Sequence, residues 1–296
     1  MSDVSVSPNP LKRALGRVNW GYLWYQLKQS PLTLGGGAIV LTVLLLVIFA
    51  PVFATHDPNA IDLRARLTAP SLTHFFGTDE VGRDIYSRIL YGGRQSVAVG
   101  FFVVIVAGLS GTLIGAFAGL IGGRVDTVIM RLMDVVLSVP SLVLIMALAA
   151  ALGPSLINAA IAIALVRVPV YVRLARGQTL LIREMSFVTA AETFKASRLH
   201  ILRWHILPNI LSPVMVQATL DLGSTILLAS ALSFIGLGAQ QPTAEWGAMV
   251  ATGRNYILDQ WWYSAFPGFA ILITATAFNL LGDGIRDILD PKQKAR

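Results

Sequence analysis

Apolar segments of about 20 residues recur along this chain, and a helix of that length crosses the hydrocarbon core of a bilayer. Hydrophobic residues make up 55% of the 296 positions and charged residues 13%, whereas a soluble domain carries about 25% charged residues. The sequence therefore predicts an all-α membrane protein with six transmembrane helices. We expect these spans at residues 34–53, 96–121, 128–152, 156–174, 210–235 and 266–281.

The first apolar segment has a second interpretation, because Val52-Phe53-Ala54 resembles the small-residue cleavage site of a signal peptide. The apolar core of a signal peptide is usually only about 7–15 residues long, and Pro51 lies close to the site. We therefore expect a retained membrane anchor.

Six spans place both termini on the same side of the membrane, and the positive-inside rule selects that side. Residues 1–30 carry four basic residues against one acid, and residues 173–205 carry six against two. The loop at residues 236–264 has one basic residue, Arg254. Both termini and the 176–205 loop are therefore expected in the cytoplasm. The net charge of +7 fits basic residues gathered on one membrane face better than a nucleic-acid partner.

Residues 79–91 of the first outer loop read as a separate amphipathic helix. Val81, Ile85 and Ile89 share one face, and Asp79 and Glu80 occupy the first turn, where the helix dipole favours acids. Within the spans, Pro140, Pro213 and Pro267 are expected to kink their helices.

Gly111, Gly115, Gly119 and Gly123 repeat at four-residue spacing. This spacing places a bare stripe on one helix face, which lets another helix backbone approach closely in lipid. We interpret the stripe as a packing surface rather than a substrate contact.

Ionisable residues at membrane depth are costly and tend to be functional. Arg131 and Asp134 are three residues apart on one helix, so we expect a structural ion pair between them. Asp221, Arg167 and Ser224 are the candidates for a translocation pathway. The sequence leaves open whether Asp221 faces a polar pathway or a buried arginine.

The inventory of motifs excludes most enzymes. There is no Gly-Lys dipeptide and hence no phosphate-binding P-loop, no H-E-x-x-H pair among the four histidines, and no G-x-S-x-G elbow. The absence of cysteine excludes disulfides and thiolate metal sites. We expect no catalytic residue, no metal site and no bound cofactor. A secondary transporter would show inverted repeats and paired charges at mid-membrane, and neither is evident.

The most informative segment lies between the fourth and fifth spans, at residues 187–209. It predicts a short helix, a turn near Lys195 to Ser197, and a second helix that ends ahead of Pro208. Its apolar face could cover the base of the bundle, lie on lipid or dock on a separate protein. That face comprises Ala190, Ala191, Phe194, Leu199 and Leu202.

Several motifs along the chain are distinctive: Phe76-Gly-Thr-Asp-Glu-Val-Gly-Arg-Asp84, Gly123-Arg-Val-Asp126 with Met130-Arg-Leu-Met-Asp134, Ala231-Leu-Ser-Phe-Ile-Gly-Leu-Gly238, Glu245-Trp-Gly-Ala-Met249, Phe278-Asn-Leu-Leu-Gly-Asp-Gly-Ile-Arg286 and Asp290-Pro291. Together they resemble the permease subunits of peptide/nickel ABC importers, specifically the second (C-type) of the two paired permeases. Within the class, residues 55–63 and Gly238-Ala-Gln-Gln241 look most like permeases for D-alanyl-D-alanine-type dipeptides.

In this family the segment between spans four and five is the EAA loop, whose short coupling helix fits a cleft in a cytoplasmic ATPase. The resemblance places the ATPase-coupling role on Thr189, Ala190, Ala191, Glu192, Lys195, Ala196, Ser197, Leu207 and Pro208. Thr189 stands where the family usually has Glu, and Lys195 where it usually has Gly. Lys in a backbone conformation suited to Gly would cost about 1 kcal/mol. Glu192 is a candidate to replace the missing carboxylate.

The resemblance implies a type I (MetI-like) permease bundle in a bacterial inner membrane. Its expected partners are a second homologous permease, two ATPases that bind ATP and Mg, and an extracytoplasmic binding protein. Dipeptides or short peptides are the expected substrates, with nickel or glutathione as alternatives. The implied divisions are a cytoplasmic tail at 1–33 with interfacial aromatic residues, a first helix at 34–54, an outer loop at 55–94, a permease domain at 95–288 and a cytoplasmic tail at 289–296.

Overall fold

The computed structural model describes residues 30–289, and within that range the secondary structure is helical with no named strand. Five helical segments are long and apolar enough to span a membrane, and a sixth span is formed if the bent pair Gly123–Ser138 and Ser141–Leu152 counts as one. The all-α prediction with six spans is confirmed in that form. The interfacial aromatic residues expected in the N-terminal tail, and the tail beyond residue 289, lie outside the described residues.

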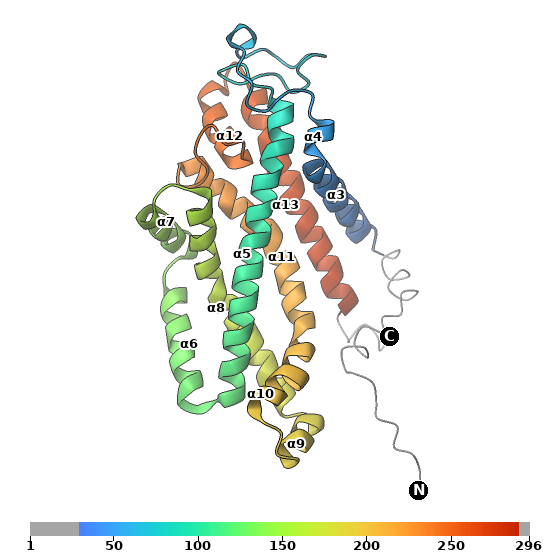
Figure 1. The fold of residues 1–296 in the computed structure, drawn as a ribbon, viewed down its shortest axis with the longest axis vertical. Helices are drawn as coiled ribbons and strands as arrows, with labels where there is room; N and C mark the ends of the chain where they lie inside the picture. Colours follow the sequence, from blue (N-terminus) through green and yellow to red (C-terminus); the bar gives the residue numbers. More distant parts are fainter. Residues whose placement is uncertain (1–29, 290–296) are drawn as a thin grey trace.

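The helices run lengthwise through an elongated bundle (Figure 1). Their bounds are α3 (Pro31–Ile48), α4 (Ala50–Phe53), α5 (Ile85–Ile121), α6 (Gly123–Ser138), α7 (Ser141–Leu152), α8 (Leu156–Arg183), α9 (Ser186–Thr193), α10 (Arg198–Ile201), a π turn (Leu202–Ile206), α11 (Leu207–Ile235), α12 (Trp246–Gly253) and α13 (Trp262–Leu289), with 3-10 turns at Leu63–Ala65 and Arg254–Tyr256.

The two ends of the bundle differ in character. The loop between α4 and α5 lies with α12 at one end, and α9 and α10 lie at the other (Figure 1). The loops expected outside the membrane therefore share an end, opposite the segment expected in the cytoplasm. We call these the loop end and the α9–α10 end.

The prediction of a separate amphipathic helix at residues 79–91 is wrong. The helix begins at Ile85 and continues without interruption for 37 residues as α5, with Asp84 as its N-cap. Asp79 precedes the helix and accepts hydrogen bonds from the backbone N–H groups of Val81 and Arg83. Gly82 adopts a φ of 82° in the same turn. These bonds hold a turn where periodicity alone suggested a helix.

The third span is broken rather than continuous. Its halves α6 and α7 meet at 90°, with Val139 extended and Pro140 at the N-cap of α7. Proline disfavours helical backbone in the residue before it, so the kink expected at Pro140 is confirmed and becomes a break. Pro213 and Pro267 instead lie inside α11 and α13, which continue past them.

The glycine stripe brings α5 against α8, and these two helices form the most extensive helix pair. A Cβ added to Gly111 would lie 2.5 Å from the Tyr171 Cβ and 2.8 Å from the Val168 carbonyl oxygen. Gly115 and Gly119 likewise face backbone atoms of α8. Gly123 is not part of the stripe, since it begins α6 with a φ of 58° and has open space around it.

Helix α6 is held to α8 by two ion pairs and has no buried residue. Arg176 donates to both oxygens of Asp126 at 3.0 and 2.6 Å, and Arg173 donates to Asp134 at 2.5 Å. The prediction of an ion pair between Arg131 and Asp134 is therefore wrong. α8 presents two arginines one turn apart, and Asp134 points across to one of them instead of along its own helix.

Opposite effects are expected from one substitution at two helical glycines. Gly111→Ala should lower the free energy of unfolding by about 1–3 kcal/mol, because the added methyl meets backbone that cannot withdraw easily. Gly177→Ala on α8 meets nothing within 4 Å and should stabilise by up to about 1 kcal/mol through helix propensity. Thermal unfolding of the purified chain in detergent measures both. Equal effects at the two positions would refute tight α5–α8 packing.

Candidate functional site

The α9–α10 segment (residues 184–206) joins α8 to α11 at the α9–α10 end of the bundle (Figure 1). One face of the segment covers the bundle's own base. Val188 is fully buried and, with partly buried Ala191 and Ala196, belongs to a cluster with Ala116 and Leu120 of α5 and with residues of α8 and α11. The interpretation that this segment docks on its own bundle holds for that face.

The opposite face of the segment carries large apolar side chains that the chain itself does not cover. Phe194 is 86% exposed and Leu199 is 73% exposed, and Ala190 is exposed beside them. Phe194 lies at the tip between α9 and α10. Because the inner face is already packed on the bundle, the outer face is available to lipid or to another protein.

The turn after α9 is a Schellman motif, with hydrogen bonds from Ala196 N–H to the Ala191 carbonyl at 3.0 Å and from Lys195 N–H to the Glu192 carbonyl at 2.9 Å. That motif requires a left-handed residue where Lys195 stands, and Lys195 has a φ of 56°. The backbone therefore keeps the geometry suited to Gly and bears the strain of about 1 kcal/mol. Ser197 then caps α10 by accepting from His200 N–H at 3.2 Å.

The second helix of the segment does not end ahead of Pro208, contrary to the sequence-based prediction. It passes through a π turn at Leu202–Ile206 into α11, where Pro208 occupies the first turn. Proline has no N–H and clashes with the carbonyl four residues earlier. The wider π turn, in which Leu207 N–H bonds to the Leu202 carbonyl, accommodates it without ending the helix.

Thr189 and Glu192 are both exposed on α9. The Thr189 hydroxyl lies 3.5 Å from the Met185 carbonyl of its own helix. Among residues 30–289, the Glu192 carboxylate forms no ion pair.

The structure brings together the three residues singled out as pathway candidates. Arg167 Nη1 lies 3.5 Å from Asp221 Oδ1, and Arg167 Nη2 donates to Ser224 Oγ at 3.0 Å. Gln217 adds a hydrogen bond to Asp221 at 3.3 Å. Asp221 thus faces an arginine, which is one of the two alternatives that the sequence leaves open.

Of these three residues, Arg167 lines a cavity. The cavity has a volume of about 470 Å³ and lies where α6 breaks into α7, against α8 and Leu228 of α11. Asp221 is buried at 5% exposure. Asp221 and Ser224 therefore position Arg167 through their contacts with its guanidinium, and Arg167 is the charged residue in the cavity lining.

At the loop end, the motif residues serve chiefly to assemble the structure. Glu245 is fully buried, caps α12 through the N–H groups of Gly247 and Ala248, and accepts from Ser96 of α5 at 2.9 Å. Asp79 binds Arg83 at 2.6 Å. Glu245 thus fastens the loop before α12 to α5, and Asp79 closes the turn that precedes α5.

A second cavity of about 700 Å³ opens at the loop end. Its polar lining comes from Gln95, Gln240, Gln241, Ser155 and Thr243. Side-chain amides both donate and accept hydrogen bonds, so this lining can bind peptide groups of either polarity. The two glutamines after Gly238 belong to the motif that the sequence analysis singled out.

One cluster was missed by sequence reasoning. His56, His74 and Asp84 form the only group of three potential metal ligands found in the described part of the chain. The histidines are 18 positions apart and fit no metal-binding spacing, so no local signal could have joined them.

Comparison with known proteins gives consistent matches. Residues 111–295 match the family of binding-protein-dependent transport system inner membrane components, and residues 19–70 match the N-terminal transmembrane domain of oligopeptide transport permease C. The chain is 61% identical to a probable D,D-dipeptide transport system permease protein of Escherichia coli K12, over 99% of this chain and 97% of the relative.

More distant relatives cover nearly the same length. A dipeptide transport system permease protein of Alkalihalophilus pseudofirmus is 44% identical over 98% of this chain and 95% of its own. A glutathione transport system permease protein of Escherichia coli O6:K15:H31 is 40% identical over 94% of this chain and 92% of its own.

Lys195 provides a direct test of the turn. Lys195→Gly should raise the free energy of unfolding by up to about 1 kcal/mol, because glycine relieves the left-handed strain. Lys195→Val should lower it by about 1 kcal/mol or more, since β-branched residues are disfavoured at positive φ. Both are measured by thermal unfolding in detergent. A valine variant as stable as the glycine variant would contradict the turn geometry.

The Arg167–Asp221 pair is tested by a double-mutant cycle. Asp221→Leu alone should destabilise the chain by about 3 kcal/mol, because it leaves an uncompensated charge at membrane depth. The Arg167→Met/Asp221→Leu variant should recover most of that loss. Additive effects in the cycle would show that the two side chains do not interact. Transport by the double variant should stay low if Arg167 also contacts the pathway.

Proposed function

This chain belongs to the family of binding-protein-dependent transport system inner membrane components, and we propose that it is the peptide-conducting permease subunit of an ATP-driven importer. The family consists of transport permeases, not enzymes. The proposed substrates are dipeptides or short peptides, with D,D-dipeptides as the refinement. ATP and Mg bind to separate ATPase subunits, and an extracytoplasmic binding protein delivers the substrate.

The observation that carries the proposal is the two-faced α9–α10 segment. Its inner face is packed on α5, α8 and α11, whereas Phe194 and Leu199 on its outer face are uncovered. An apolar surface held rigidly at the end of a membrane bundle suits a protein partner. The chain has no phosphate-binding motif of its own, so the energy of ATP hydrolysis has to enter through such a contact.

The proposed coupling is mechanical. An ATPase that closes on ATP moves the α9–α10 segment, and the buried cluster that Val188 shares with residues of α5 and α8 passes that movement to the spans. A bundle with two stable arrangements then switches from inward-facing to outward-facing. Thr189, Ala190, Glu192 and Lys195 lie at the contact surface in this scheme.

The proposal includes an orientation of the chain in the membrane. The α9–α10 end is assigned to the cytoplasm, together with both termini, because the segment between spans four and five carries the excess of basic residues. The loop end is assigned to the extracytoplasmic side, where the binding protein docks.

A second homologous permease is proposed to pair with this one. Helix α6 has no buried residue, and its Val128, Leu132 and Val135 are 58%, 58% and 67% exposed. The cavity that Arg167 lines opens beside this helix. A partner that covers α6 would place that cavity between the two subunits, and lipid covers the remaining apolar surface.

For the substrate, the 61% identity to a probable D,D-dipeptide permease favours short peptides, and the amide-lined cavity at the loop end suits them. The glutathione permease relative keeps a γ-linked tripeptide as the second candidate. Nickel has no support among the relatives named above. The Arg167–Asp221 pair meets one expectation for a secondary transporter, but family membership outweighs it.

The coupling surface is tested by introducing charge at two neighbouring positions. Ala190→Asp should reduce co-purification of the ATPase and ATP-driven uptake by at least about tenfold, because it buries an unpaired charge in the contact. Ala190 is preferred to Ala191, which packs partly on the bundle itself. Thr189→Glu is the matched control, since it adds the same charge at the position where the family usually carries Glu, and it should leave both readouts intact.

Vesicles that contain this chain without ATPase subunits should not accumulate peptide against its gradient. Accumulation in such vesicles would refute the proposed function.

A further inference from the structure

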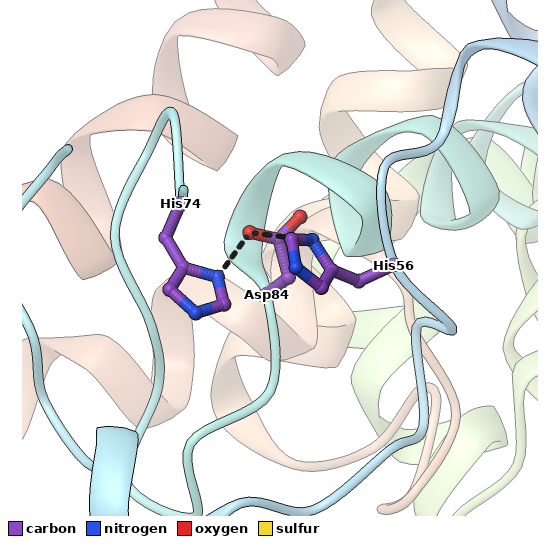
Figure 2. Close-up of side chains that lie close together, drawn as sticks. All are labelled: His56, His74 and Asp84. Atoms are coloured by element: carbon purple, nitrogen blue, oxygen red, sulfur yellow. Dashed lines mark hydrogen bonds and ion pairs between the residues drawn. The ribbon is translucent and has the colours of Figure 1, made fainter. Parts of the chain in front are cut away.

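Two histidines and one carboxylate converge at the loop end, next to the start of α5 (Figure 2). His74 Nδ1 lies 2.9 Å from Asp84 Oδ1, and His56 Nδ1 lies 3.8 Å from the same oxygen. The imidazole rings stack with centroids 4.6 Å apart. One ligand atom from each residue lies within 4.8 Å of the others.

From this geometry we infer that His56, His74 and Asp84 bind a divalent transition metal ion of the Zn²⁺ type. The ion would cross-link separate parts of the outer loop of this permease. This metal site does not depend on the proposed peptide substrate or on the proposed ATPase contact.

The carboxylate of Asp84 divides its two oxygens between separate tasks. Oδ2 caps α5 by accepting from Ser87 N–H at 2.8 Å and lies 3.4 Å from the Thr55 hydroxyl. Oδ1 is turned toward the two imidazoles. The helix N-terminus therefore fixes the carboxylate without using the oxygen that would bind the ion.

The ligands are also held by their surroundings. The His74 N–H donates to Ser71 Oγ at 3.1 Å, and its carbonyl accepts from Ser71 N–H and Gly77 N–H at 2.8 and 2.9 Å. Asp84 is 2% exposed, whereas the His56 side chain is 40% exposed. A rigid inner pair with an accessible third ligand gives the ion a route of entry.

The donor set selects the kind of ion. Neutral imidazole and carboxylate ligands suit Zn²⁺ at about 2.0–2.1 Å, so tetrahedral ligands lie roughly 3.3 Å apart. The distances from Asp84 Oδ1 to the two imidazole nitrogens, 2.9 and 3.8 Å, bracket that value, and all three ligand atoms lie within 4.8 Å of one another. Three protein ligands leave one position for water. Imidazole also suits Cu²⁺ and Ni²⁺, which are comparison ions in the test.

An ion at this site would join three separate stretches of chain: the residues after α4, the middle of the loop, and the N-cap of α5. The exposed Arg64 and Arg66 lie between the two histidines. Binding should therefore reduce the mobility of that stretch, and trypsin cleavage after these arginines reports on it.

The experiment uses the full chain in detergent, purified with an affinity tag that contains no histidine. Zn²⁺ binding is measured by calorimetric titration, and Co²⁺ absorption reports the ligand geometry. The wild type should bind one Zn²⁺, and His56→Ala or His74→Ala should weaken binding by at least about tenfold. Zn²⁺ should slow trypsin cleavage at Arg64 and Arg66 in the wild type and not in the two variants.

The remaining two histidines of the chain, His200 and His205, give the matched control. The His200→Ala/His205→Ala variant should retain both Zn²⁺ binding and protection from trypsin. His56→Ala removes an exposed side chain whose recorded hydrogen bond is to Thr55, so its helix content should match the wild type by circular dichroism. The inference would be overturned if the wild type bound Zn²⁺ no more tightly than a folded His56→Ala variant. It would also be overturned if only the His200→Ala/His205→Ala control lost binding.

Discussion

The close approach of α5 and α8 is the contact on which the rest of the bundle depends. Gly111, Gly115 and Gly119 have no side chain to hold the two backbones apart, and dispersion contacts replace the hydrophobic drive that lipid does not supply. The same α8 carries Arg173 and Arg176 on one side, which hold α6, and Arg167 on another, which meets α11. Three neighbours are thus positioned from one helix.

The α9–α10 segment is anchored to the α5–α8 pair. It starts where α8 ends, and Val188 is buried in the same cluster as Ala116 and Leu120 near the end of α5. The Schellman turn and the π turn set its shape at some cost in backbone strain. Such a segment suits the coupling role proposed for it.

Buried charges have different roles at the loop end and at membrane depth. At the loop end, buried Asp79, Asp84 and Glu245 satisfy backbone N–H groups and so fix loops that have little regular structure. At membrane depth, Asp221 serves a single guanidinium that reaches a cavity. The acids at the loop end therefore stabilise the loops, whereas Asp221 holds one charged side chain, Arg167, inside the spans.

Local sequence determined the helical class, the approximate spans and a kink at Pro140, because each follows from apolar run length or from the chemistry of neighbouring residues. The family resemblance left open whether Lys195 keeps the left-handed backbone suited to Gly, and the structure shows that it does. The tertiary structure alone decided which charges meet. Arg167 finds Asp221, Asp134 takes Arg173 in place of Arg131, and His56 joins His74 and Asp84. These partners are distant in the sequence, and only the packing of helices and loops sets their distance.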